Sequence, residues 1–113
     1  MNRTKKGITF NNGVYNLLTT TVSIEYRDSV LAEDGHWIYG VTKQDRGGAV
    51  ILISIKDEDG DPISAEQIES TLRHELFHFI LDTLYFTEES QNETLVEWLA
   101  TATQVLNKQG LNI

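Results

Sequence analysis

The chain has 113 residues, of which 40% are apolar and 23% charged, a composition typical of one folded domain and too apolar for a disordered chain. It contains no cysteine, which excludes disulfide bonds, thiolate metal sites and cysteine nucleophiles. The net charge of −8 is concentrated in residues 57–113, whose two basic and twelve acidic side chains argue against a nucleic-acid partner, because phosphate binding needs clustered Lys and Arg.

No segment is predicted to enter a membrane. The longest uninterrupted apolar run, Ala49–Ile53, is far shorter than the ~18 residues that a membrane span needs. The basic segment Met1–Lys6 is not followed by an apolar stretch, so we expect no signal peptide. Together with the absence of cysteine, these features favour a cytoplasmic protein.

Residues up to about Lys56 have the pattern of short strands. Asn11-Asn12-Gly13 is a hairpin-type turn signal between two predicted strands, Gly7–Phe10 and Val14–Leu18. Further strands are predicted at Thr21–Tyr26, Trp37–Thr42 and Ala49–Ile55.

After Lys56–Pro62 the pattern predicts two helices. The first should run from about residue 65 to about residue 85, since Ser64 and Gln67 match a capping box and apolar residues then recur at helical spacing. The second should run from Thr87–Ser90 to Asn107–Gly110, with an apolar side made of Leu95, Trp98, Leu99, Ala102, Val105 and Leu106. Strands followed by helices predict a single α+β domain, in which a short antiparallel or mixed sheet packs on two helices.

The first predicted helix contains the sequence His74-Glu75-Leu76-Phe77-His78. Residues four apart lie on one face of a helix, so the two histidines can bind the same metal ion. Glu75 lies beside them and can accept a proton from a water molecule at the metal. The opposite face carries Ile68 and Leu72, so we expect the motif on the polar side of an amphipathic helix. The alternative is a helix with two surface histidines and a surface glutamate.

A catalytic zinc usually takes three protein ligands and water, and few residues can supply the third. The only other histidine is His36, in a predicted loop far upstream. Leu81 and Leu84 stand where the extended HExxHxxGxxH motif has its glycine and third histidine, which excludes that form. A carboxylate on the second helix remains, and Glu93 and Glu97 share a face there.

The histidine motif and the acidic residues of the second predicted helix together resemble the pattern of a known protein family. His74–His78 followed by Asn92-Glu93-Thr94-Leu95-Val96-Glu97 resembles the HExxH…NExxxD pattern of gluzincin metallopeptidases of the thermolysin type. The resemblance implies that Glu93 is the third zinc ligand. It also implies that Glu97, in place of the family's Asp, hydrogen-bonds one of the ligating histidines, which would fix the orientation of that ring.

The whole chain resembles the small single-domain HExxH proteins of bacteria, phages and mobile elements, akin to the ImmA/IrrE group. The order of the predicted strands and helices matches this group over about residues 22–106. The amino acids themselves match only in the two helices, at Thr71–Glu75 and Glu93–Ala100. The DNA-binding helix-turn-helix often found beside such modules is missing. A phage or mobile-element origin in a bacterial cytoplasm follows from this likeness alone.

Other interpretations of Glu93 stay open. Ser90-Gln91-Asn92-Glu93 also matches a capping box, in which Glu93 would satisfy backbone donors at the start of the helix. Alternatively, Glu97 or another acid is the third ligand.

These features together predict a zinc-dependent metallopeptidase that acts on peptide or protein substrates. The expected roles are Zn²⁺ ligands for His74, His78 and Glu93, general base for Glu75, and oxyanion donor for one of Tyr85, His36 and Tyr39. In zincins an edge strand beside the HExxH helix binds extended peptide, and Ala49–Ile55 is this strand, a buried core strand, or both if one of its edges is free. The main alternative function is a non-catalytic, zinc-stabilised protein-binding domain, and a third is a hydrolase acting on another bond.

Overall fold

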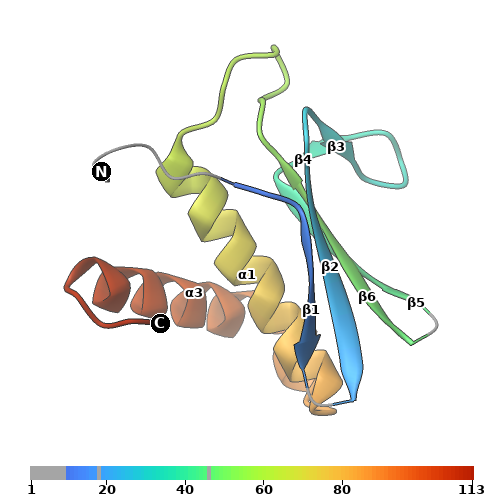
Figure 1. The fold of residues 1–113 in the computed structure, drawn as a ribbon. Helices are drawn as coiled ribbons and strands as arrows, with labels where there is room; N and C mark the ends of the chain where they lie inside the picture. The colour runs from blue at the N-terminus through green and yellow to red at the C-terminus, as the bar shows by residue number, and fades with distance from the viewer. Residues whose placement is uncertain (1–9, 18, 46) are drawn as a thin grey trace.

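The computed structural model describes residues 10–17, 19–45 and 47–113, which form an α+β fold (Figure 1). The strands are β1 (Gly13–Leu17), β2 (Thr20–Arg27), β3 (Val30–Leu31), β4 (Trp37–Ile38), β5 (Gly40–Asp45) and β6 (Gly48–Ser54). The helices are α1 (Ala65–Thr83), α2 (Thr87–Ser90) and α3 (Glu93–Lys108). The predicted fold class, with strands before helices, is confirmed. None of the described helices combines the length and apolar character needed to cross a lipid bilayer.

The main sheet is mixed, with its four strands in the order β1-β2-β6-β5. The outer pairs, β1–β2 and β5–β6, are antiparallel, whereas β2 and β6 run parallel with Ile24 beside Ile51. β3 and β4 pair with each other in the connection between β2 and β5. Because β6 enters the sheet between β2 and β5, the predicted strand Ala49–Ile55 is a central strand. The prediction that this segment is a core strand is confirmed, and the prediction that it is an edge strand is wrong. The edge of the sheet beside it is formed by β5.

Two other strand predictions need correction. β1 begins at Gly13, the last residue of the predicted turn, and pairs with β2, so the chain reverses between Leu17 and Thr20. Residues 7–9 of the predicted strand Gly7–Phe10 lie outside the described residues. The predicted strand Trp37–Thr42 is divided at Tyr39, since β4 pairs with β3 and β5 pairs with β6.

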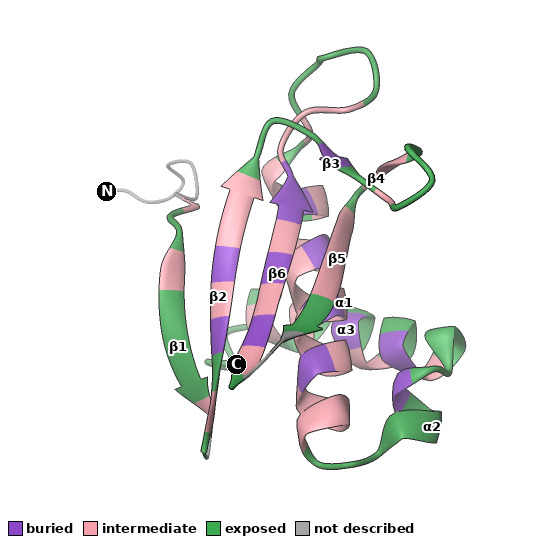
Figure 2. Ribbon diagram, turned by 90° about the vertical axis from the view of Figure 1, so that its right-hand side faces the viewer, coloured by how far each residue is buried: buried purple, intermediate pink, exposed green. Residues whose placement is uncertain are grey.

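The elements form three layers, with α1 packed on one face of the sheet and α3 packed on α1 (Figures 1 and 2). Alternate residues of β2 and β6 point toward α1, as the alternating buried bands in Figure 2 show. Each large apolar side chain buried there stabilises the fold by about 1.5–3 kcal/mol. The buried core comprises Val22, Ile24, Ala49, Ile51, Ile53, Ile68 and Phe79.

Caps determine where the helices begin. α1 begins as predicted, because the Ser64 hydroxyl accepts a hydrogen bond from the backbone N–H of Gln67 at 3.2 Å. The predicted second helix is interrupted, and its main part, α3, is capped by Asn92, whose Oδ1 accepts from the backbone N–H of Leu95 at 3.0 Å. The capping box that starts at Ser90 is therefore wrong. Gly110, with φ of 105°, follows α3 as the predicted stop.

The apolar side predicted for the second helix is wrong, since none of its six residues is buried: Leu95 and Leu99 are half-buried and Trp98 is 71% exposed. The buried residues of α3 are instead Val96 and Ala100. α3 packs mainly on α1 and α2 and buries a narrow stripe rather than a wide face. The other predicted core positions that are exposed are Ala102, Val105 and Leu106.

The first turn of α1 meets the last turns of α3. Lys108 pairs with the Glu66 carboxylate, and Gln104 donates from Nε2 to the Glu66 carbonyl at 3.2 Å. The hydrogen bond from Lys108, together with its charge, lowers the pKa of the Glu66 carboxyl. These contacts set the direction of α3 along α1, although an exposed ion pair stabilises little.

The closest approach of β5 to α1 predicts that Gly40→Ala destabilises the protein. A Cβ at Gly40 would lie 2.7 Å from Thr71 Cγ2 and 3.0 Å from the Leu52 carbonyl oxygen, so the strand and the helix would have to separate. We expect the free energy of unfolding to fall by about 1–3 kcal/mol, measured by denaturant titration. Gly13→Ala is the matched control, since its Cβ would meet only the half-exposed ring of Tyr15. Equal stability of the two variants would contradict this packing.

Candidate metal centre

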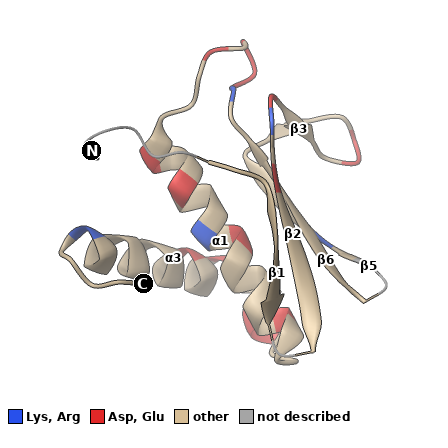
Figure 3. Ribbon diagram, viewed as in Figure 1, with Lys and Arg blue, Asp and Glu red and all other residues tan. Residues whose placement is uncertain are grey.

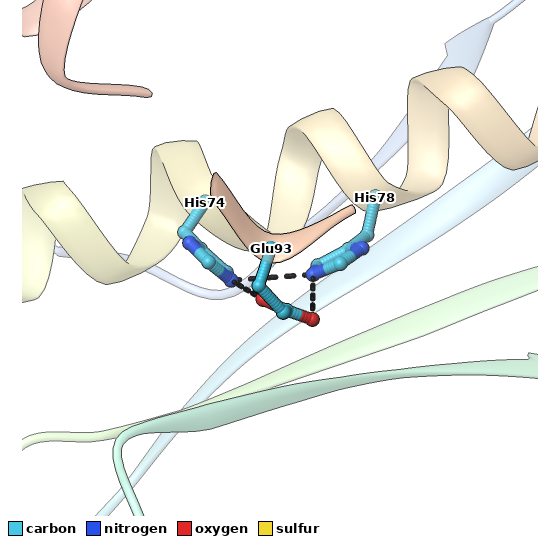
Figure 4. Close-up of side chains that lie close together, drawn as sticks. All are labelled: His74, His78 and Glu93. Carbon is cyan, nitrogen blue, oxygen red and sulfur yellow. Dashed lines mark hydrogen bonds and ion pairs between the residues drawn. The ribbon is translucent and has the colours of Figure 1, made fainter. Parts of the chain in front are cut away.

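Three of the predicted site residues meet between α1 and α3. His74 and His78 extend from successive turns of α1, and Glu93 is the first residue of α3 (Figure 4). The Glu93 carboxylate faces both rings, with Oε1 3.0 Å from His74 Nε2 and Oε2 3.3 Å from His78 Nε2. The two Nε2 atoms lie 3.2 Å apart. This group could hold a metal ion.

The donor atoms of the three side chains lie close enough together to surround one metal ion. The two histidines contact different oxygens of the Glu93 carboxylate, at 3.0 and 3.3 Å, and their Nε2 atoms lie 3.2 Å apart. One ligand atom from each residue lies within 4.8 Å of the other two. Two ligands of a tetrahedral zinc site are about 3.3–3.6 Å apart, so this spacing is compatible with one ion.

The hydrogen bonds on the far side of each ring are compatible with a metal ion between the rings. His74 Nδ1 lies 2.8 Å from Glu97 Oε1. His78 Nδ1 lies 3.2 Å from Ser90 Oγ, which in turn donates to the His78 carbonyl at 3.4 Å. When Nδ1 of a neutral imidazole donates such a bond, its Nε2 lone pair is available to bind a metal ion.

Glu75 is held apart from this cluster, against β5. Only 8% of its surface is exposed, which corrects the expectation of a polar, open helix face. Its Oε1 lies 2.8 Å from the Thr42 hydroxyl, and its stem lies beneath Gly40. The edge strand covers this side of α1, and for that reason Thr71, one turn earlier, is also buried.

Two cavities meet at the motif. One, of about 280 Å³, extends from His74 and Glu75 toward Tyr39, and the other, of about 420 Å³, extends past His78 toward Asp82. Among the described residues no Lys or Arg lines either cavity, and Figure 3 shows acidic positions along α1. The cluster is therefore reached through an acidic groove between β5 and the helices.

The three candidate oxyanion donors lie in different places. Tyr39, immediately before the edge strand β5, lines the smaller cavity together with His74. His36 lies in the β3–β4 connection, where its exposed ring pairs with Asp34 at 2.8 Å. Tyr85 follows the end of α1 with φ of 66° and is 89% exposed, because the helix stops at Thr83 rather than at residue 85. Only Tyr39 is near the cluster.

Three residues of the site were not found by sequence reasoning. Thr42 and Gly40 lie on a strand more than thirty residues before the motif, and no local pattern connects them to it. The sequence predicts a role for Ser90 only as an alternative helix cap, because it lies three residues before Glu93. Its burial at 4% exposure beside His78 follows from the separate turn of α2.

Comparison with protein-family models, with curated protein sequences and with solved structures gives no significant match to this chain. The geometry of the site must therefore carry any functional argument.

The hydrogen bonds from Glu97 and Ser90 to the two imidazole rings predict that loss of either partner weakens metal binding, to different extents. Glu97→Ala and Ser90→Ala each release one imidazole ring, so we expect the affinity of the cluster for a divalent metal ion to fall about 10–100-fold, with the larger loss for the charged partner. A competition titration against a chromophoric chelator measures this affinity. Glu88→Ala, which removes an exposed carboxylate of α2, is the control and should bind as the wild type does. Unchanged affinity in both test variants would contradict the arrangement.

Proposed function

We propose that this protein is a zinc-dependent metallopeptidase, in which His74, His78 and Glu93 hold the ion and Glu75 is the general base. The proposal rests mainly on one observation, the convergence of ligand atoms from His74, His78 and Glu93 within 4.8 Å of one another, on a helix whose adjacent Glu75 is buried. Catalytic zinc sites use three protein ligands of this kind and keep one position for water. The resemblance to gluzincins assigns the same residues to the same roles.

The donor set favours zinc among divalent ions. Two imidazole nitrogens and one carboxylate oxygen, with no sulfur, match the ligands of hydrolytic zinc sites and differ from the all-oxygen sites of Mg²⁺ and Ca²⁺. When bound, zinc lowers the pKa of water toward ~7 and polarises a substrate carbonyl.

The protein's own residues supply proton transfer and orientation. Glu75 lies where both cavities meet, so its carboxylate can take a proton from water and later give it to the leaving amine. Tyr39 lines the same groove and is the nearest of the three candidate oxyanion donors. Glu97 and Ser90 hold the two imidazole rings.

The free edge of β5 provides a place for an extended peptide. The Ser54 N–H bonds the Tyr39 carbonyl, and in an antiparallel pair such bonded positions alternate along the strand. By this alternation Gly40, Thr42 and Gln44 direct their backbone groups away from β6. No strand of the described part of the chain pairs with this edge. A peptide that added there would run alongside α1, past the motif.

Elemental analysis with a matched variant tests the site. We expect about one zinc per chain in the wild-type protein and much less in Glu93→Ala, because two imidazoles alone bind zinc weakly. Zinc retained by Glu93→Ala would move the third ligand to Glu97 or elsewhere. A wild-type protein that takes up no zinc even from added salt would contradict the proposal.

Glu75→Gln separates catalysis from metal binding. This variant keeps the size of the side chain, so it should retain zinc and lose at least 100-fold in cleavage rate. A peptide library analysed by mass spectrometry, with zinc-loaded wild-type protein, measures cleavage without a known substrate. Zinc binding with no cleavage of any peptide would favour the alternative, a metal-stabilised protein-binding domain.

A further inference from the structure

We propose that Thr42 is a positioning residue for Glu75, through the hydrogen bond that its hydroxyl donates to the carboxylate. This inference rests on the proposed function, in which Glu75 is the base. It goes further because it states that the strand with the proposed peptide-binding edge also orients the carboxylate of the base.

The hydrogen bond has a defined direction. Thr42 Oγ1 lies 2.8 Å from Glu75 Oε1 and 3.1 Å from the Glu75 backbone carbonyl oxygen. The hydroxyl has one proton, and Oε1 is the nearer of the two acceptors. Oε1 is therefore engaged, and Oε2 is the oxygen left to exchange a proton with water.

Packing restricts the rest of the glutamate side chain. A Cβ at Gly40 would lie 3.5 Å from Glu75 Cγ, so the main chain of β5 passes directly over the stem of the glutamate. A free glutamate has several rotatable bonds and loses conformational entropy when it is fixed. Strand packing fixes the stem and Thr42 fixes the carboxylate, so the base is oriented before substrate arrives.

Thr42 can contact the proposed base through its side chain and a peptide substrate through its backbone. Its side chain points toward α1, whereas its backbone groups belong to the free edge of β5. Removal of the hydroxyl should leave the backbone, and therefore peptide binding, unchanged. The role of Thr42 thus predicts a lower kcat without a change in KM, whereas a general loosening of the strand would raise KM as well.

Two substitutions at Thr42 test the role. Thr42→Val keeps the shape of the side chain and removes the hydroxyl, and we expect kcat about 10-fold lower, with unchanged KM and zinc content. Thr42→Ser keeps the hydroxyl and should stay within about 2-fold of wild-type kcat. Any peptide that the wild-type protein cleaves in the library serves as the substrate. Equal kcat for Thr42→Val and wild type, or a loss in Thr42→Ser as large as in Thr42→Val, would overturn the proposal.

A measurement without substrate separates this inference from the proposed function. The ¹³C resonance of the Glu75 carboxyl, observed by NMR in zinc-loaded protein, should shift in Thr42→Val, while that of Glu97 should not. An unmoved Glu75 resonance would overturn the positioning role even if the enzyme is active. A shifted resonance in a protein that cleaves no peptide would overturn the proposed function, and with it the catalytic meaning of the contact.

Discussion

The close approach of β5 to α1 at Gly40 is the constraint on which the site depends. The strand can lie on the helix there only because residue 40 has no side chain. This contact buries Glu75, brings the Thr42 hydroxyl to its carboxylate and leaves the outer backbone groups of the strand facing the groove. A larger separation of strand and helix would turn an oriented, buried glutamate into an ordinary surface side chain.

The other half of the site depends on how α3 begins. Asn92 caps the helix, so Glu93 occupies its first turn, where a negative charge interacts favourably with the helix dipole. The short helix α2 turns the chain so that Ser90 and Glu93 both face α1. Ligands from two helices mean that bound metal would join the layers directly, in addition to their apolar contacts at Val96 and Ala100.

The sequence predicted the parts of the site that depend on local spacing. The i,i+4 relation fixes His74 beside His78, and strands before helices indicate an α+β class. The shared face of Glu93 and Glu97 also follows from local spacing, whereas the specific hydrogen bond of Glu97 to a ligating histidine was implied only by the family resemblance. The parallel pairing of β2 with β6, the exposure of Trp98 and the contact of Thr42 with Glu75 depend on residues far apart in the chain. Periodicity shows which face of an element is apolar, but not which neighbour covers its polar face, and for that reason the burial of Glu75 was missed.

The free edge of β5 also bears on solubility. An edge strand with unpaired backbone groups is a template for the strand of any other chain, including a second copy of this protein. The strand is only six residues long and carries a charged Lys43, and copies with a net charge of −8 repel one another at low salt. The same acidic surface that surrounds the groove would then protect its open edge from self-association, and screening by salt would weaken that protection.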